Sequence, residues 1–353
     1  MKKNYFLLAA TTMMFAACAQ TDMVNEVVTE EAPQAIGFDA FANKQTRAEI
    51  TKDELKKVGF QVWGYKYPST ANGIIWENTT TGEGENLVTT NANIYPVFVG
   101  TNVTFLQGIG NDPGSWGYKE TQYWDQASKY KFYAIAPIKN NDFYHFSKGN
   151  FTIEGVTSNK ATESDDYVIA SEVEKDGKNH DIVSFTFSHI MSKISFKLKA
   201  GVDETITITS LTMSGWDNGV GKFAQGATTE WSIPTSTPTT VGQGTCDILI
   251  ASDDNENVND NVTLEGLNDI TEDIVGLSYI MVPQTIAANT LTFNIAYEIG
   301  GEKFEQEGTV STSQIWEKNT HYTYTITVSP HAIVFDVTTV NGWQTGTGST
   351  TIE

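Results

Sequence analysis

The stretch Ala35-Ile36-Gly37-Phe38-Asp39-Ala40-Phe41 determines how the rest of the chain is interpreted. Apolar residues recur there at every second position, which predicts a β-strand with one buried face, formed by Ile36, Phe38 and Ala40. The strand lies between a cysteine that follows an apolar segment, Cys18, and a basic site, Thr46-Arg47-Ala48. We therefore expect a strand that is part of the folded protein at first and is later released from it by proteolysis.

The N-terminus indicates export and a lipid anchor. Lys2-Lys3 precede an apolar run, Tyr5 to Ala17, that is too short to span a bilayer and is typical of a signal peptide over residues 1–17. Phe15-Ala16-Ala17-Cys18 resembles the bacterial lipobox, with Phe15 where Leu is usual. We predict lipidation at Cys18 and a polar leader over residues 18–47; the alternative is an ordinary signal peptide cut nearby.

Composition favours a β-rich extracellular protein. Of 353 residues 39% are apolar and only 18% charged, and Thr, Asn, Gly and Ser are abundant. The net charge of −21 repels nucleic acid and anionic lipid, so neither is an expected partner. Cys246 has no partner for a disulfide if Cys18 carries lipid.

Short alternating segments with turn residues between them predict an all-β fold of two tandem β-sandwiches, over residues 48–180 and 181–353. The charged run Glu172 to Asp181 is the expected boundary, Thr51 to Val58 a short helix, and Glu77 to Asn93 a long loop or hairpin. The last strand, Ile333 to Val340, places three apolar side chains on one face: Ile333, Phe335 and Val337. No internal repeat stands out.

An ordered set of motifs resembles the Bacteroidales fimbrillin-like proteins, the Mfa/FimA-like type V pilins. The set runs from the lipobox to about residue 343: Ile36-Gly37-Phe38, Thr46-Arg47-Ala48, Phe60-Gln61-Val62-Trp63-Gly64-Tyr65, Tyr123-Trp124, Tyr130 to Pro137, Phe185 to Ile194, Val282-Pro283-Gln284 and Trp316 to Tyr324. Each motif alone is weak, whereas their common order is fairly specific.

The resemblance implies two transthyretin-like β-sandwich domains in a cell-surface fimbrial subunit, exported as an outer-membrane lipoprotein. It further implies that an arginine-directed protease cuts between Arg47 and Ala48. The removable strand would be Ile36 to Phe41, and a strand of a neighbouring subunit would replace it, with a candidate donor near residues 333–340. Expected partners are therefore other fimbrial subunits, the outer membrane through the lipid, the protease, and a host or bacterial surface ligand. Lys44 offers another basic cut site.

No motif indicates catalysis, a cofactor or a metal. His189 lies in an aromatic run without a second ligand at metal-binding spacing, and a packed role is expected for it. Asp253-Asp254-Asn255-Glu256-Asn257 lacks the later glycine and glutamate of a calcium loop, and Gly219-Val220-Gly221-Lys222-Phe223 is not a phosphate-binding loop. We therefore predict that the chain is not an enzyme.

Two other classes stay open from the sequence. One is a surface lipoprotein of tandem β-sandwiches that binds glycans and never polymerises, and the other is a carbohydrate-active enzyme, for which no two carboxylates are visibly paired. Filament formation after proteolytic nicking distinguishes the fimbrial subunit from both.

Overall fold

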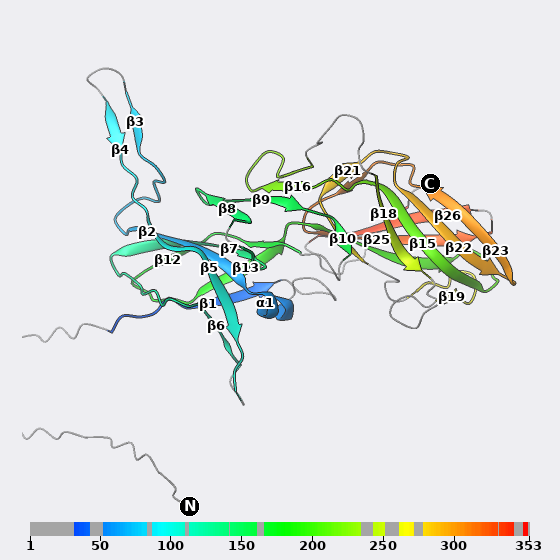
Figure 1. The fold of residues 1–353 in the computed structure, drawn as a ribbon, viewed down its shortest axis with the longest axis horizontal. Coiled ribbons are helices and arrows are strands. Elements are labelled where there is room, and N and C mark those ends of the chain that lie inside the picture. Colours follow the sequence, from blue (N-terminus) through cyan, green and yellow to red (C-terminus); the bar gives the residue numbers. More distant parts are fainter. Residues whose placement is uncertain are drawn as a thin grey trace, which may run out of the picture. The chain divides into compact units, whose positions relative to one another are not determined.

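The computed structural model describes residues 32–42, 52–82, 87–109, 113–140, 142–160, 166–233, 243–250, 261–271, 278–330, 332–341 and 349–351. The chain divides into two compact units, Met1–Pro33 and Gln34–Glu353. The helix and all strands below lie in the second unit. Within the described residues the fold is nearly all β, and the predicted fold class is confirmed (Figure 1).

An eight-stranded sheet dominates the first half of the chain (Figure 1). Its strands, in spatial order, are β1 (Phe38–Ala42), β13 (Val183–His189), β11 (Val168–Ala170), β7 (Ser128–Ala136), β2 (Phe60–Pro68), β5 (Tyr95–Leu106) and β6 (Ser115–Gly117), with β12 (Val173–Asp176) on β7. The predicted helix is α1 (Lys52–Val58), and the predicted hairpin is β3 (Thr79–Thr81) with β4 (Val88–Thr90).

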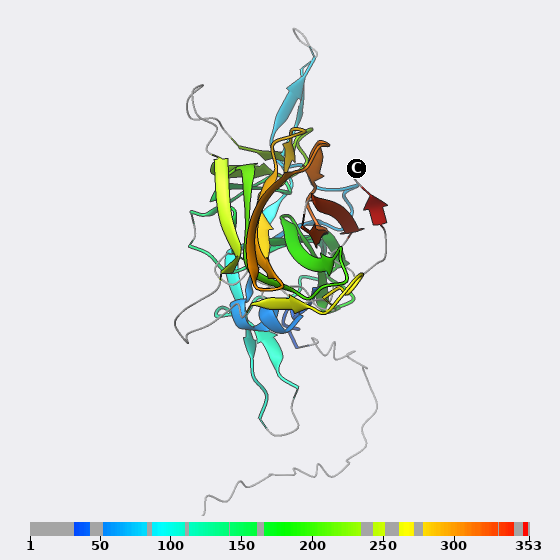
Figure 2. The same cartoon turned by 90° about the vertical axis from the view of Figure 1, so that its right-hand side faces the viewer.

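Two further sheets face each other in the second half. The six-stranded sheet has the order β10 (Asn159–Lys160), β20 (Tyr279–Met281), β14 (Ser192–Ala200), β25 (Thr320–Ser329), β26 (Ala332–Asn341) and β27 (Ser349–Thr351). The five-stranded sheet has the order β18 (Gln243–Ile250), β15 (Ile206–Asp217), β22 (Thr292–Ile299) and β23 (Glu302–Thr309), with β19 (Val262–Leu264) on β15. Figure 2 shows these strands on either side of their common interior.

The smaller sheets complete the described structure. One is four-stranded, in the order β17 (Trp231–Ser232), β16 (Gly221–Ala224), β9 (Asn150–Val156) and β8 (Tyr144–Ser147). The other pairs β21 (Gln284–Ile286) with β24 (Gln314–Trp316). Because β9 pairs with β16, the first and second halves of the chain share a sheet as well as a buried apolar cluster.

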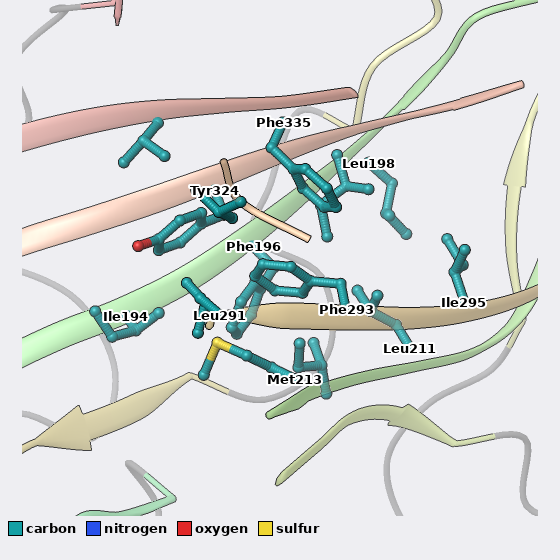
Figure 3. Packing of buried hydrophobic residues seen from close by; sticks show 14 of the residues in the cluster. Ile194, Phe196, Leu198, Leu211, Met213, Leu291, Phe293, Ile295, Tyr324 and Phe335 are labelled. Carbon is teal, nitrogen blue, oxygen red and sulfur yellow. The ribbon is translucent and has the colours of Figure 1, made fainter. Parts of the chain in front are cut away.

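The core between the six- and five-stranded sheets follows from period-2 alternation in the strands that line it. Phe196 of β14, Phe293 of β22 and Tyr324 of β25 are fully buried and contact one another, with ring centroids 5.6–6.3 Å apart (Figure 3). Such ring pairs add to the free energy of burial. The tandem transthyretin-like arrangement of the domains stays a prediction.

The position of β13 bears on the expected boundary at residue 180. β13 begins at Val183 and pairs with β1 on one side and β11 on the other, so the eight-stranded sheet extends to His189. Any division into two sandwiches that keeps this sheet intact would follow His189. Within the charged run before it, Val173–Asp176 form β12 against β7. The boundary between the two domains stays a prediction.

His189 has the packed position expected for it. Its side chain is 2% exposed, and its Nδ1 lies 2.7 Å from Oδ2 of Asp166, which is equally buried. The pair joins the end of β13 to the start of β11, where Val168 is in register with His189.

A buried polar cluster lies on the six-stranded sheet. Lys193 is 2% exposed, Ser195 is fully buried, and Nε2 of His321 lies 2.9 Å from the Ser195 Oγ. Burial lowers the pKa of the Lys193 ammonium to about 8. Burial, together with the charge of Lys193, lowers the pKa of His321 to about 3. Lys193 and Ser195 alternate with Ile194, Phe196 and Leu198 in the sequence of β14. This alternation indicates a polar face but does not show that the face is covered.

We expect Lys193→Met to stabilise the protein at neutral pH. We also expect it to remove the rise of the free energy of unfolding with pH in the alkaline range. Between about pH 8 and 10.5 the unfolded chain holds a proton at Lys193 that the folded chain has lost, so the wild-type free energy of unfolding rises with pH there. The rise attributable to this group is about 3 kcal/mol. Urea unfolding at pH 7.5 and 10 would measure it, with Lys197→Met as the half-exposed control on the same strand. If the free energy of unfolding of Lys193→Met rose with pH as steeply as that of the wild type, the lowered pKa of Lys193 would be contradicted.

Candidate functional site

The first strand is anchored by the three side chains that the sequence singled out. Ile36 is 1%, Phe38 6% and Ala40 2% exposed, so all three lie in the core of the eight-stranded sheet. Phe41, on the opposite face of β1, is 41% exposed. The predicted one-sided burial of this strand is therefore present.

Phe38 fills an aromatic slot. Its ring centroid lies 5.3–6.3 Å from those of five rings: Phe60, Phe98, Tyr118, Phe132 and Phe185. Four of these rings come from different strands, β2, β5, β7 and β13, and Tyr118 directly follows β6. The rings around Phe38 therefore come from four strands of the sheet and from the residue that follows a fifth strand.

The backbone before β1 is held on two sides. The Ile36 N–H donates to the Gln122 carbonyl at 2.8 Å, and the Trp124 N–H donates to the Gln34 carbonyl at 2.9 Å. The Tyr118 hydroxyl donates to the Ile36 carbonyl at 2.7 Å. On the other side the Val183 N–H donates to the Gly37 carbonyl at 2.9 Å.

β1 ends the hydrogen-bonded order of its sheet and pairs with β13 in parallel, with Phe38 opposite Val183 and Ala42 opposite Phe187. No other described strand pairs with β1 along its own length. Removal of an end strand leaves the rest of the sheet paired but exposes one row of backbone groups on β13. Along its own length β1 is thus bonded to one described strand only.

β26 holds the candidate donor side chains. It pairs antiparallel with β25 over its whole length, and β27 pairs with its central part. Phe335 is 6% exposed and stacks on Phe293 with centroids 4.9 Å apart, as Figure 3 shows. A Cβ on Gly308 would lie 2.7 Å from the Phe335 ring, so the glycine is what permits this packing. Val337 is also buried, whereas Ile333 is half-buried.

The other predicted site residues, Cys18, Arg47 and Ala48, lie outside the described residues, as does the alternative cut site Lys44. Their roles stay predictions. Within the described ranges, no helix is both long and apolar enough to cross a membrane. In the same ranges no group of three or more His, Cys, Asp or Glu side chains is arranged to hold a metal ion.

Sequence reasoning did not find the residues that line the slot. Phe60, Phe98, Phe132 and Phe185 each occupy buried positions of strands, so alternation marks them as core. Alternation cannot show that they converge on one ring, because this depends on the order of strands in the sheet. Tyr118 gives no sequence signal, since its role depends on its hydroxyl reaching the Ile36 carbonyl.

Comparison with known families identifies the class of protein to which this fold and slot belong. The fimbrillin-like family model matches residues 40–343, and the chain belongs to that family. It is accordingly a fimbrial or adhesin-like subunit, and the predicted resemblance is confirmed. No curated protein matches the sequence.

Several solved structures are similar to this chain at low identity. A Bacteroides uniformis protein assigned to cell adhesion is 17% identical, with a TM-score of 0.44 over 87% of this chain and 98% of its own. A Bacteroides ovatus protein with the same assignment is 16% identical, with a TM-score of 0.42 over 90% and 100%. The tip fimbrial protein Mfa3 from Porphyromonas gingivalis, truncated at its C-terminus, is 10% identical, with a TM-score of 0.35 over 87% and 98%. At these TM-scores the similarity carries no argument about function.

Proposed function

We propose that the chain is exported as an outer-membrane lipoprotein, cut after Arg47, and assembled into a cell-surface fimbria when a neighbouring subunit's strand replaces β1. The observation that carries the proposal is the aromatic slot around Phe38, because a removable end strand with buried anchors is what strand exchange requires. Membership of the fimbrillin-like family supports the same conclusion.

The covalent connection of β1 to the rest of the sheet supports cleavage as the trigger. β1 ends at Ala42 and α1 begins at Lys52, so the connection runs through residues 43–51. Arg47 lies in this connection and is the only arginine in the chain. An arginine-directed protease therefore has one site, and cutting there separates β1 from everything that follows.

Cleavage alone leaves β1 in its slot by non-covalent contacts. Its departure exposes the apolar slot and a row of unpaired groups on β13, which is unfavourable in water. An incoming strand that restores the ladder and fills the slot removes that cost. A slot near the start of one subunit and a donor near the end of the next make a head-to-tail contact that does not close, so a filament results.

The lipid anchor is tested by Cys18→Ser. We expect the variant to incorporate no labelled fatty acid and to be lost from the cell surface, because the thiol is the only group in the lipobox that can carry the lipid. Metabolic labelling and surface immunoblotting measure the two effects. Cys246→Ser serves as the matched control, and unchanged surface display of Cys18→Ser would count against the anchor.

The proposal as a whole is tested on surface material sheared from cells that express the chain. N-terminal sequencing of the high-molecular-weight fraction should give Ala48 as the first residue. If the chain is found only as a lipidated species that begins at Cys18, with no high-molecular-weight fraction, the proposed function is wrong.

A further inference from the structure

A surface hollow lies among the segments that follow β7 and β9 and the residue that precedes β11. Its volume is about 250 Å³. The amide and hydroxyl side chains in its lining are exposed, so the hollow is open to solvent. The side chains that line it include those of Lys139, Asn140, Phe143, Thr157, Asn159 and Tyr167.

Hydrogen bonds hold the walls of the hollow. The Lys139 N–H donates to Oε1 of Gln61, which is itself 1% exposed, at 3.3 Å. Nδ2 of Asn159 donates to Oγ1 of Thr157 at 2.9 Å. A site whose walls are already held in place orders fewer groups when a ligand enters, and this favours binding.

Two stacked rings form an aromatic wall. Phe143 and Tyr167 have ring centroids 5.7 Å apart and planes 19° apart. Nζ of Lys139 lies 5.6 Å from each of the two centroids. The attraction between a cation and aromatic rings helps to fix the position of the ammonium. The hollow therefore combines an apolar ring surface with a positive charge and several amide and hydroxyl groups.

The charge of the lining contrasts with that of the chain, which is −21. Although the chain has 43 acidic residues, no carboxylate is among the described residues that line the hollow. Next to its walls in sequence, Glu154 pairs with Lys222. Asp166 pairs with His189, and Asp142 is exposed to solvent. At about 0.15 M salt, charges more than about 8 Å apart are largely screened, so the net charge does not exclude a small anion here.

A second hollow adjoins the first. It has a volume of about 410 Å³ and is lined by Asn102, Ile138, Lys139 and Asn140. Lys139 and Asn140 line both hollows. A ligand in the first hollow can therefore continue past these two residues into the second.

We propose that the two hollows bind neighbouring units of an acidic oligosaccharide, with a sugar carboxylate on Lys139. The amides of Asn140 and Asn159 each offer donors and an acceptor to ring hydroxyls, and the Phe143 ring offers a surface to the C–H groups of a pyranose. The carboxylate gains a charge-assisted hydrogen bond from the ammonium. This inference goes beyond the proposed function, because it holds for a chain that polymerises and for one that does not.

The lining favours a sugar over other acids. Pockets for drug-like ligands are lined mainly by hydrophobic side chains and measure about 300–1,000 Å³. Here amide, hydroxyl and ammonium groups make up most of the lining, and the first hollow has the size of a single small ring. An acidic peptide brings a carboxylate as well, but extended peptides are bound largely through main-chain hydrogen bonds at a sheet edge. The hollows present side chains instead.

The test uses the uncut soluble chain from Ala19, which retains β1. The probes are two acidic tetrasaccharides, one of galacturonic acid and one in which glucuronic acid alternates with N-acetylglucosamine. Their methyl esters, which keep the rings and lose the charge, are the control ligands. Saturation-transfer NMR titrations should give at least one acid a dissociation constant on the order of 1 mM or below, and its ester one at least about tenfold higher.

Two substitutions locate the site. Lys139→Met should bind acid and ester equally, because the carboxylate has lost its partner. Asn140→Asp keeps the shape of the side chain and adds a negative charge, so it should weaken the acid at least about tenfold and the ester less than about threefold. Lys303→Met is the matched control, since it removes an 85% exposed lysine from β23, and it should leave both constants unchanged.

Each outcome bears on the inference. A preference for the acid that disappears in Lys139→Met supports it. Equal binding of acid and ester by the wild type overturns the carboxylate contact. Binding of neither acid, or tighter binding of a tetraglutamate peptide than of both, overturns a sugar as the ligand. None of these results depends on cleavage after Arg47 or on filaments, so the proposed function is tested separately.

Discussion

Phe38→Ala is expected to weaken the binding of β1 to its slot by about 3–5 kcal/mol, the usual cost of truncating a buried phenylalanine. The effect should be at the upper end, because Phe38 contacts five rings that cannot all move inward to fill the space. In the chain cut after Arg47, the dissociation constant of the leader fragment should rise about 150- to 4,000-fold, toward the upper limit. Titration of the labelled fragment measures it.

Phe41→Ala is the matched control, since it removes the same ring from the opposite, 41% exposed face of the same strand. Its effect on the dissociation constant should be less than about tenfold. Equal effects of the two substitutions would show that β1 is not held through the slot.

Arg47→Ala is expected to stop assembly altogether. Without the only arginine of the chain, an arginine-directed protease has no site, and β1 stays covalently tied to α1. A tethered strand re-enters its slot far faster than a second chain can compete, because its effective concentration is high. Cells that express the variant should hold a lipidated, uncut monomer, as judged by mass spectrometry and by the absence of high-molecular-weight surface material.

Lys44→Ala is the control for this second prediction, because it changes the neighbouring basic residue and leaves Arg47 in place. It should assemble like the wild type. Polymers built from Arg47→Ala would show that assembly does not depend on the cut.

Local patterns predicted the elements well where one face of a strand is buried. Tyr322, Tyr324, Ile326 and Val328 alternate along β25, and all four are buried. The same holds for Ile36, Phe38 and Ala40. Gly300-Gly301, a pair typical of hairpin turns, forms the turn between β22 and β23, where both glycines have positive φ.

Pairing between distant strands could not be predicted in this way. β1 lies parallel to β13, and β14 lies parallel to β25 with Ser192 opposite Thr320. Neither contact leaves a trace in local periodicity, because an alternating strand fits either direction and either neighbour. For the same reason local periodicity does not show that β13, which follows the expected boundary at residue 180, pairs with β1 and β11.

In the candidate site, too, local patterns predict the strand but not its distant neighbours. Alternation predicts the buried side chains Ile36, Phe38 and Ala40. It does not predict the slot around Phe38, because the five rings that line the slot come from separate parts of the sheet.

The most direct test of strand exchange is a digest of the soluble chain from Ala19 with an arginine-specific protease, followed by N-terminal mass analysis and electron microscopy. The account predicts a single cut, a core that begins at Ala48, release of the fragment 19–47, and filaments that appear as the fragment leaves. An intact chain with Arg47 protected, or filaments that form before any cut, would contradict it.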